Sequence, residues 1–305
     1  MKFSTPIKIT PFASPIEYSS YSFFIGSCFA EHISKKFDQH KLKNTSNPFG
    51  ILFHPLAVEK IIQKAVQDIV FTADDLVVSN ELWCCLDAHS ELSATNKDEL
   101  LAQLNQRLRQ TQLALQQATH ISITLGTSWV YKYLPTNQMV ANCHKIPQKE
   151  FSKELLSVEM IAESLNNIIR LLPNKHILFT ISPVRHSKDG FFENNLSKAH
   201  LFAALNQVLG SQVHYFPAYE IIMDELRDYR FFAADMLHPN LLAIDYVWER
   251  FSENYLSAKA QDTSKEIAAI QKALQHKAFN PDTLKHQQFV ANTQKRIEAL
   301  GELWY

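Results

Sequence analysis

Glycine is scarce in this sequence. Only 6 of its 305 residues are glycine, about 2% where ~7% is usual. Four of them stand in short distinctive segments: Gly26 in GSCFA, Gly50 in NPFG, Gly126 in LGTSW and Gly190 in KDG. Glycine tolerates sharply turned backbone and the close approach of other atoms. These four positions therefore indicate loops where the backbone turns or comes close to a ligand.

The sequence also lacks the features of several functional classes. Lysine and arginine number 30 against 31 acidic residues, and without a basic run we expect no nucleic-acid partner. No stretch approaches the roughly 18 apolar residues of a membrane span. Residues 1–10 have no apolar core of the kind found in secretory signals. The sequence therefore predicts a cytoplasmic protein that contacts no membrane.

The cysteines and histidines form no metal-binding pattern. Cys28, Cys84, Cys85 and Cys143 lack zinc-ligand spacing, and the 13 histidines include no HExxH. Adjacent Cys84 and Cys85 would form a strained disulfide, so we expect reduced thiols. The sequence predicts no metal and no other cofactor.

Four short β-rich runs lead directly into unusual loops. They cover residues 21–25, 120–125, 176–181 and 212–216, and lead into the motifs GSCFA, GTSW, SPVRH and PAYE. Helical patterns follow Ser27 and cover residues 97–118, 155–172, 195–209, 257–276 and 281–303. Strands that alternate with helices predict βαβ units and a mostly parallel sheet. Ligands bind outside the carboxyl ends of the strands in such sheets, where these motifs fall.

Two regions lie outside this alternation. Residues 71–118 are a predicted insertion, with a short extended piece around Trp83 followed by a long helix. Beyond Tyr255 the chain becomes polar and helical. We therefore expect an α/β domain over residues 1–255 and a helical C-terminal extension over 256–305, which could support a homo-oligomer.

Ser27 and the segment DMLHP stand near opposite ends of the α/β region. Ser27 lies where a strand gives way to a helix, a position that can expose a nucleophilic Oγ but that equally suits a helix N-cap serine. His238 precedes a proline and therefore belongs to a loop. Ser, Asp and His in this order can form a hydrolase triad, with Ser27 as nucleophile, His238 as base and Asp235 as its partner. A surface acid beside a capping histidine would give the same Asp-x-x-His pattern.

Several motifs follow one another between about residues 8 and 248: GSCFAE, NPFG, LGT, SPVRH, FPAYEI, DELRDYRF and DMLHP. Together they resemble the GSCFA-domain proteins, a bacterial branch of the SGNH (GDSL-like) hydrolases. The resemblance implies a flavodoxin-like three-layer α/β/α fold and serine esterase or acyltransferase chemistry. It places the nucleophile on Ser27 and the Asp-x-x-His pair on Asp235 and His238.

The resemblance also implies an oxyanion hole. Its donors would be the N–H of Ser27, a glycine N–H that maps to Gly50, and an asparagine side chain that has no match, because Ser-Trp stands where Asn-Asp is expected. Thr127, Ser128 or Asn47 could donate instead. Losing one such donor typically costs about 100- to 1000-fold in rate. A catalytically degenerate protein that binds a glycan or a partner is therefore the alternative.

Three further residues are candidates for the site. Arg185 and His186 follow a strand end and could bind an anionic group of the substrate or assist catalysis, since arginine binds carboxylate or phosphate with two hydrogen bonds. Arg185 could instead pair with Asp189. Cys28 is a second possible nucleophile, because a thiol pKa can fall at a helix N-terminus. The expected substrate is a small acyl ester, such as an O-acetyl group on a glycan or cell-wall component.

Overall fold

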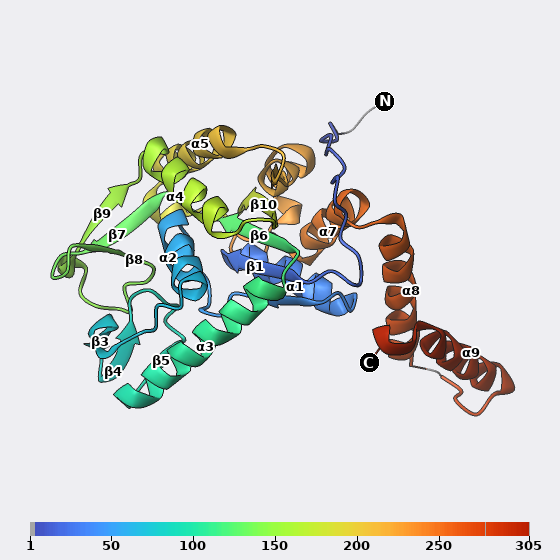
Figure 1. Cartoon of the computed structure of the whole chain (residues 1–305). Helices are drawn as coiled ribbons and strands as arrows, with labels where there is room; N and C mark the ends of the chain where they lie inside the picture. Colours follow the sequence, from blue (N-terminus) through green and yellow to red (C-terminus); the bar gives the residue numbers. More distant parts are fainter. Residues whose placement is uncertain (1–3, 278, 305) are drawn as a thin grey trace.

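The computed structural model describes residues 4–277 and 279–304, and its centre is a five-stranded parallel sheet (Figure 1). The strands are β1 (Ser22–Gly26), β2 (Asn44–Ser46), β6 (His120–Leu125), β10 (His176–Ile181) and β11 (Val213–Tyr215). Their order is β11-β10-β6-β1-β2, and every neighbouring pair is parallel. Counted along the chain, this is the 2-1-3-4-5 order of flavodoxin-like folds. The predicted parallel sheet is confirmed.

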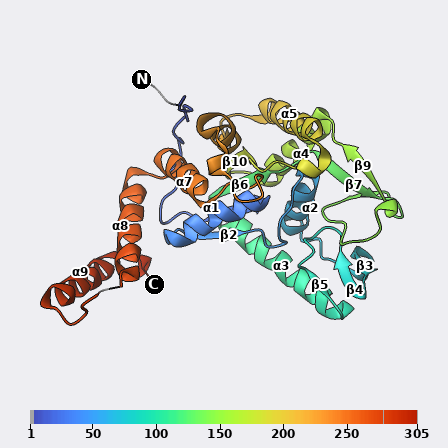
Figure 2. The ribbon, with the colours of Figure 1, turned by 180° about the vertical axis from the view of Figure 1, so that it is seen from behind.

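Helices cover both faces of this sheet. Successive strand residues point to opposite faces, so Phe23 packs into one hydrophobic core and Phe24 into the other. The first core is covered by α2 (Pro55–Val66), α3 (Lys97–Gln117), α4 (Val158–Leu171) and α5 (Phe191–Val208). The second is covered by α1 (Cys28–Gln39) and α7 (Leu241–Tyr255). The three-layer α/β/α arrangement is visible from both sides (Figures 1 and 2).

Polar side chains define where several helices begin. Asn96 accepts hydrogen bonds from the N–H groups of Asp98 and Glu99 at the start of α3, and Asn240 accepts one from Ala243 at the start of α7. Such caps satisfy N–H groups that have no partner inside the helix. The cap at Asn240 explains why α7 begins just after the His-Pro pair of the predicted loop.

Two small antiparallel sheets were not predicted from the sequence. One contains β3 (Leu76–Ser79), β4 (Leu82–Cys85) and β5 (Ser93–Ala94); the other contains β7 (Trp129–Tyr133), β8 (Gln138–Val140) and β9 (Phe151–Leu155). Residue 155 ends β9, so the helix predicted over 155–172 is shorter than expected. Both sheets lie on the side of the molecule away from the C-terminal helices (Figures 1 and 2).

The C-terminal helices project from the α/β body (Figure 1). They are α8 (Ala258–Gln275) and α9 (Leu284–Leu300), and Arg296 of α9 pairs with Glu266 of α8 through two hydrogen bonds of 2.6 and 2.9 Å. Among residues 4–277 and 279–304, every helix is too short or too polar to cross a bilayer.

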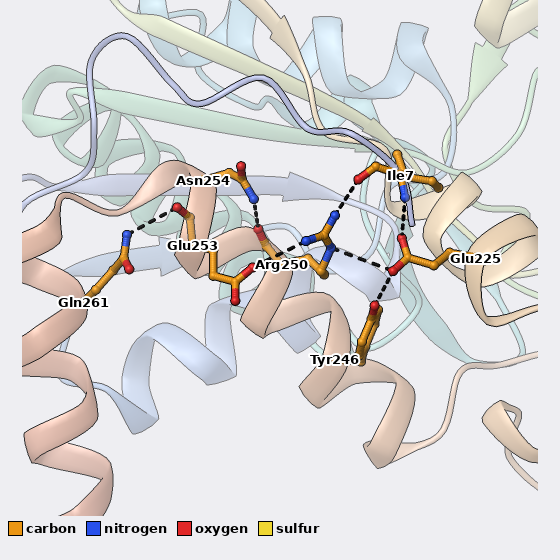
Figure 3. A network of polar contacts seen from close by, with 7 residues as sticks. All are labelled: Ile7, Glu225, Tyr246, Arg250, Glu253, Asn254 and Gln261. Carbon is orange, nitrogen blue, oxygen red and sulfur yellow. Dashed lines mark hydrogen bonds and ion pairs between the residues drawn. The ribbon is translucent and has the colours of Figure 1, made fainter. Parts of the chain in front are cut away.

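A polar network fastens the N-terminal segment to α7 (Figure 3). Glu225, only 6% exposed, accepts hydrogen bonds from the N–H of Ile7 at 2.9 Å and from the hydroxyl of Tyr246. Arg250 lies 3.9 Å from the Glu225 carboxylate and donates to the carbonyl of Ile7. The segment then follows α7, with Phe12 N–H bonded to Asn254 O at 2.8 Å. It thereby covers the amino end of the central sheet.

Candidate active site

The turn between β1 and α1 requires glycine at position 26. Gly26 has φ +133°, and a Cβ there would lie 2.1 Å from the carbonyl oxygen of Thr124 on the neighbouring strand. Its N–H donates to Oδ1 of Asn47 at 2.8 Å. The close approach of β6 and the bond to Asn47 together fix the path of the chain into Ser27.

Ser27 precedes the first residue of α1 without capping the helix. Its side chain makes no capping hydrogen bond, so the N-cap interpretation does not describe its Oγ. The side chain is 1% exposed, and Oγ has no partner among the described residues. Buried hydroxyls of Ser22 and Ser164 lack partners too, but Ser27 lines a cavity and they do not. Its position beside the cavity therefore distinguishes Ser27.

The cavity lies at the carboxyl ends of β1, β6 and β10 and measures about 460 Å³. Its polar lining residues include Ser27, Thr127, Ser182, Arg185, His186 and His238. This is the edge of the sheet at which the sequence motifs predicted a ligand site. Within the described part of the chain, no cluster of three or more His, Cys, Asp and Glu side chains has a geometry suited to a metal.

Asp235 and His238 form a hydrogen-bonded pair. Nδ1 of His238 lies 2.6 Å from Oδ2 of Asp235, while Oδ1 accepts the N–H groups of His238 at 3.0 Å and Leu237 at 2.9 Å. These bonds, first that from the His238 N–H, hold the pKa of Asp235 at about 2. The charged Asp235 carboxylate accepts a hydrogen bond from Nδ1–H of His238. This tautomer leaves Nε2 of His238 without a proton and therefore able to act as a base.

Ser27 and His238 line the same cavity, but the described structure has no hydrogen bond between them. The Asp235–His238 hydrogen bond of the predicted triad is therefore present, whereas the hydrogen bond between Ser27 and His238 is not formed in the described structure. Catalytic hydrogen bonds of this kind are often long without substrate and shorten in the complex.

Arg185 holds the loop that carries this pair. Its Nη2 donates to the carbonyl of Met236 at 2.7 Å, and its guanidinium lies 5.0 Å from the ring of Phe232 and 5.3 Å from that of Tyr229. Met236 adopts a left-handed φ of +61°, a conformation that costs free energy in residues other than glycine. Arg185 stabilises that conformation from outside the loop.

The alternative partner predicted for Arg185 is wrong. Asp189 pairs with Lys153, not with Arg185. The role of His186 in binding an anionic group stays a prediction; burial, and next the nearby positive charge of Lys198, lowers its pKa to about 4. A neutral His186 offers the cavity a hydrogen-bonding nitrogen, since its Nε2 is buried without a partner in the described structure.

Sequence reasoning missed Lys198 on α5. Its ammonium is buried and donates to the carbonyls of Gly126 at 2.6 Å and Ser182 at 2.8 Å, which follow β6 and β10. Burial lowers its pKa to about 7. The spacing from Lys198 to Leu201 and Leu205, three and seven residues, places it on the buried face of the helix and was the available signal.

The amides expected to form the oxyanion hole are engaged within the protein. The Ser27 N–H donates to Thr124 O at 3.0 Å, and the Gly50 N–H donates to Asn47 O at 2.8 Å. Gly50 and Asn47 lie outside the cavity lining. Asn47 instead supports the Gly26 turn described above. The structure thus places these three predicted donors in structural roles.

Thr127 and Ser128 bond to α5. Thr127 lines the cavity, but its Oγ1 lies 3.0 Å from Ser197 Oγ and accepts the Trp129 N–H at 3.0 Å. Ser128 is fully buried outside the lining, and its Oγ donates to Ser197 O at 3.0 Å. Of the predicted replacement donors, only Thr127 therefore borders the cavity.

The first turn of α1 offers other donors. The N–H groups of Cys28 and Phe29 lie in the first turn, where a helix offers no intrahelical acceptor, and neither makes a backbone–backbone hydrogen bond in the described structure. Cys28 borders the cavity beside Ser27. Burial, followed by the charge of Glu31, raises the pKa of its thiol. Because a protonated thiol is a poor nucleophile, this environment favours Ser27 over Cys28.

Two protein-family models match this chain. A model of the GSCFA family matches residues 22–251, and a model described as the GSCFA domain protein, C-terminal domain, matches residues 267–304. The chain belongs to the GSCFA family. A search of curated proteins found no match. The GSCFA match contains the Gly26 turn, Ser27 and the Asp235–His238 pair, whereas the C-terminal match covers the second half of α8 and all of α9.

Proposed function

We propose that this GSCFA-family chain is a serine-dependent ester hydrolase or acyltransferase of the SGNH type. One observation carries the proposal: Ser27 and the Asp235-bound His238 line a single cavity at the carboxyl end of the sheet. The unpartnered Oγ of Ser27 adds support, because buried polar groups normally have partners.

The residues divide the reaction among them. Ser27 Oγ attacks the ester carbonyl carbon while Nε2 of His238 takes the hydroxyl proton, and Asp235 stabilises the resulting imidazolium. The N–H groups of Cys28 and Phe29 at the positive end of α1 stabilise the oxyanion. Collapse of the tetrahedral intermediate releases the alcohol, which takes the proton from His238. Water or an acceptor alcohol then attacks the acyl-serine by the reverse steps.

The second candidate function is binding without turnover. Two observations favour it: the Ser27 N–H donates to Thr124, and no hydrogen bond joins Ser27 to His238 in the described structure. A glycan or partner protein would then occupy the cavity while Ser27 makes only a hydrogen bond.

Hydrolysis of p-nitrophenyl esters distinguishes the two candidates. For the wild type we expect turnover that falls by at least about 10⁴-fold in Ser27→Ala, because removing the nucleophile disables the triad as a unit. Ser22→Ala is the matched control: Ser22 is also buried with an unpartnered Oγ, but it begins β1 at the opposite end from the cavity. Full activity in Ser27→Ala would contradict the mechanism. Binding without any ester turnover would favour the second candidate.

A further inference from the structure

One side of the active-site cavity is built by the small antiparallel sheet and not by the central sheet. Trp129, Val130 and Tyr131 of β7 and Val140 of β8 line it. Their neighbours in the lining are Phe53, Ala141, Cys143 and Val184. Aliphatic and aromatic carbon therefore borders the space next to Ser27.

Two polar side chains of this wall, Trp129 and His54, have their ring nitrogens engaged within the protein. Nε1 of Trp129 donates to Glu193 O at 3.1 Å. His54 bonds Val140 O through Nε2 at 3.0 Å and accepts the Ala57 N–H through Nδ1 at 3.2 Å, and burial lowers its pKa to about 4. Burial raises the pKa of Cys143 to about 11, so its thiol is neutral. A ligand against this wall meets mostly carbon, with the Tyr131 hydroxyl and the Asn142 side chain as its remaining polar groups.

Such a wall suits an alkyl chain better than a sugar. Burying hydroxyls without partners costs free energy, whereas each buried methylene contributes favourably. The cavity of about 460 Å³ is far larger than the two carbons of an acetyl group need, since a water-sized group takes up only ~30 Å³. The expected O-acetyl group would leave most of the space unused.

We propose that this cavity takes the acyl chain of a medium-chain aliphatic ester, with the carbonyl at Ser27. The inference rests on the proposed esterase function for the position of the carbonyl. The alkyl part is held by the β7–β8 wall, and the alcohol part extends toward the exposed Lys188 at the cavity edge.

A chain-length series tests the inference. We expect kcat/KM for p-nitrophenyl acetate, butyrate, hexanoate and octanoate to rise about threefold to fourfold for each added methylene, the equivalent of one buried CH₂. A flat series, or a preference for acetate, would overturn the inference while leaving the esterase function intact.

Two substitutions locate the effect. Ala141→Leu narrows the cavity and should lower the octanoate rate far more than the acetate rate, so that the two rates approach each other. Ala13→Leu makes the same change at an exposed residue beyond the amino end of the sheet and should leave the series unchanged. An octanoate preference that persists in Ala141→Leu would place the acyl chain of the substrate outside this part of the cavity and overturn the inference.

A binding measurement separates this inference from the proposed function. Free octanoic acid should raise the melting temperature of the wild type, and should do so less in Ala141→Leu, while acetic acid should have no effect. If no ester is hydrolysed but octanoate still stabilises the protein in this way, the esterase function is wrong and the acyl-chain binding site is supported. If octanoate stabilises neither the wild type nor Ala141→Leu, the acyl-chain binding site is wrong, whatever the hydrolysis assay shows.

Discussion

The two ends of the central sheet treat their polar side chains differently. At the amino end, His120 and His176 are paired across β6 and β10, and their rings stack 5.2 Å apart. His120 bonds Ser14 O at 2.9 Å and Thr119 Oγ1 at 2.8 Å, and Phe12 of the N-terminal segment packs against both rings. The protein thus covers both rings and gives His120 its partners, although the buried Oγ of Ser22 at the same end has none in the described structure.

The carboxyl end leaves comparable groups available to a ligand. Ser27 Oγ and His186 Nε2 are buried without partners in the described structure, and both residues line the cavity with His238. A histidine near the carboxyl end of β10 is thus less satisfied than one at the amino end of the neighbouring strand. Burial alone does not mark the site; burial beside a cavity without an internal partner does.

The largest expected effect on activity comes from removing the Asp235 carboxylate at the carboxyl end of the sheet. Asp235→Asn should lower ester hydrolysis by about 10⁴-fold, because an amide in this place favours the wrong histidine tautomer. Asp228→Asn is the control, since Asp228 is another partly exposed carboxylate of the same segment, paired with Arg230. Equal losses in the two variants would show that the segment, and not the Asp–His pair, is what activity needs.

The same carboxylate predicts a pH dependence of stability. The folded pKa of Asp235, about 2, lies below its unfolded value of ~3.9. Its contribution to the free energy of unfolding is therefore present above pH ~4 and is lost as the pH falls toward 2. Urea unfolding at several pH values should show the difference between wild type and Asp235→Asn shrinking over that window. A difference that stays constant would contradict the assigned hydrogen bonds.

A smaller effect is expected from Arg185, which contacts the loop from outside. Arg185→Lys keeps the charge but loses the planar contact with Tyr229 and Phe232, so the loop shifts. We expect kcat to fall about 10- to 100-fold, the usual cost of a misplacement near 1 Å, with KM nearly unchanged. Arg230→Lys, at an exposed pair, should change neither constant. A rise in KM alone would instead assign Arg185 to substrate binding.

The smallest effects are expected when one histidine at each end of the central sheet is replaced by phenylalanine. His120→Phe removes hydrogen bonds that the protein makes to itself and should cost about 1–3 kcal/mol of unfolding free energy with no change in activity. His186→Phe removes a nitrogen that has no internal partner, so stability should hold while KM rises about fivefold to tenfold. The same pattern of losses in both variants would remove the distinction between the two ends.

Local patterns made much of the fold predictable. Four strands of the parallel sheet and the helices α1, α3 and α8 follow from hydrophobic periodicity and capping residues. The sheet formed by β7, β8 and β9 was missed because its pairing depends on contacts between segments, and Phe151–Leu155 adjoins a helical pattern. That sheet supplies the apolar wall of the cavity, so the size of the acyl site was also hidden.

The site was predictable in its residue types and less so in its hydrogen bonds. Ser27 and His238 reach one cavity because motifs at strand ends share an edge of the sheet. The engagement of the Ser27 N–H depends on the register that sets Gly26 opposite Thr124, which no local pattern reveals. Lys198 was missed for a similar reason: its two carbonyl partners come from distant strand ends.

Labelling with a fluorophosphonate probe, followed by peptide mapping, tests the central claim most directly. Such a probe reacts with a serine whose hydroxyl is activated by a neighbouring base. The account predicts an adduct on Ser27 in the wild type and in Ser22→Ala, no adduct in Ser27→Ala, and a strongly reduced labelling rate in His238→Gln. An adduct on Cys28, or labelling of Ser27 that is indifferent to His238→Gln, would contradict it.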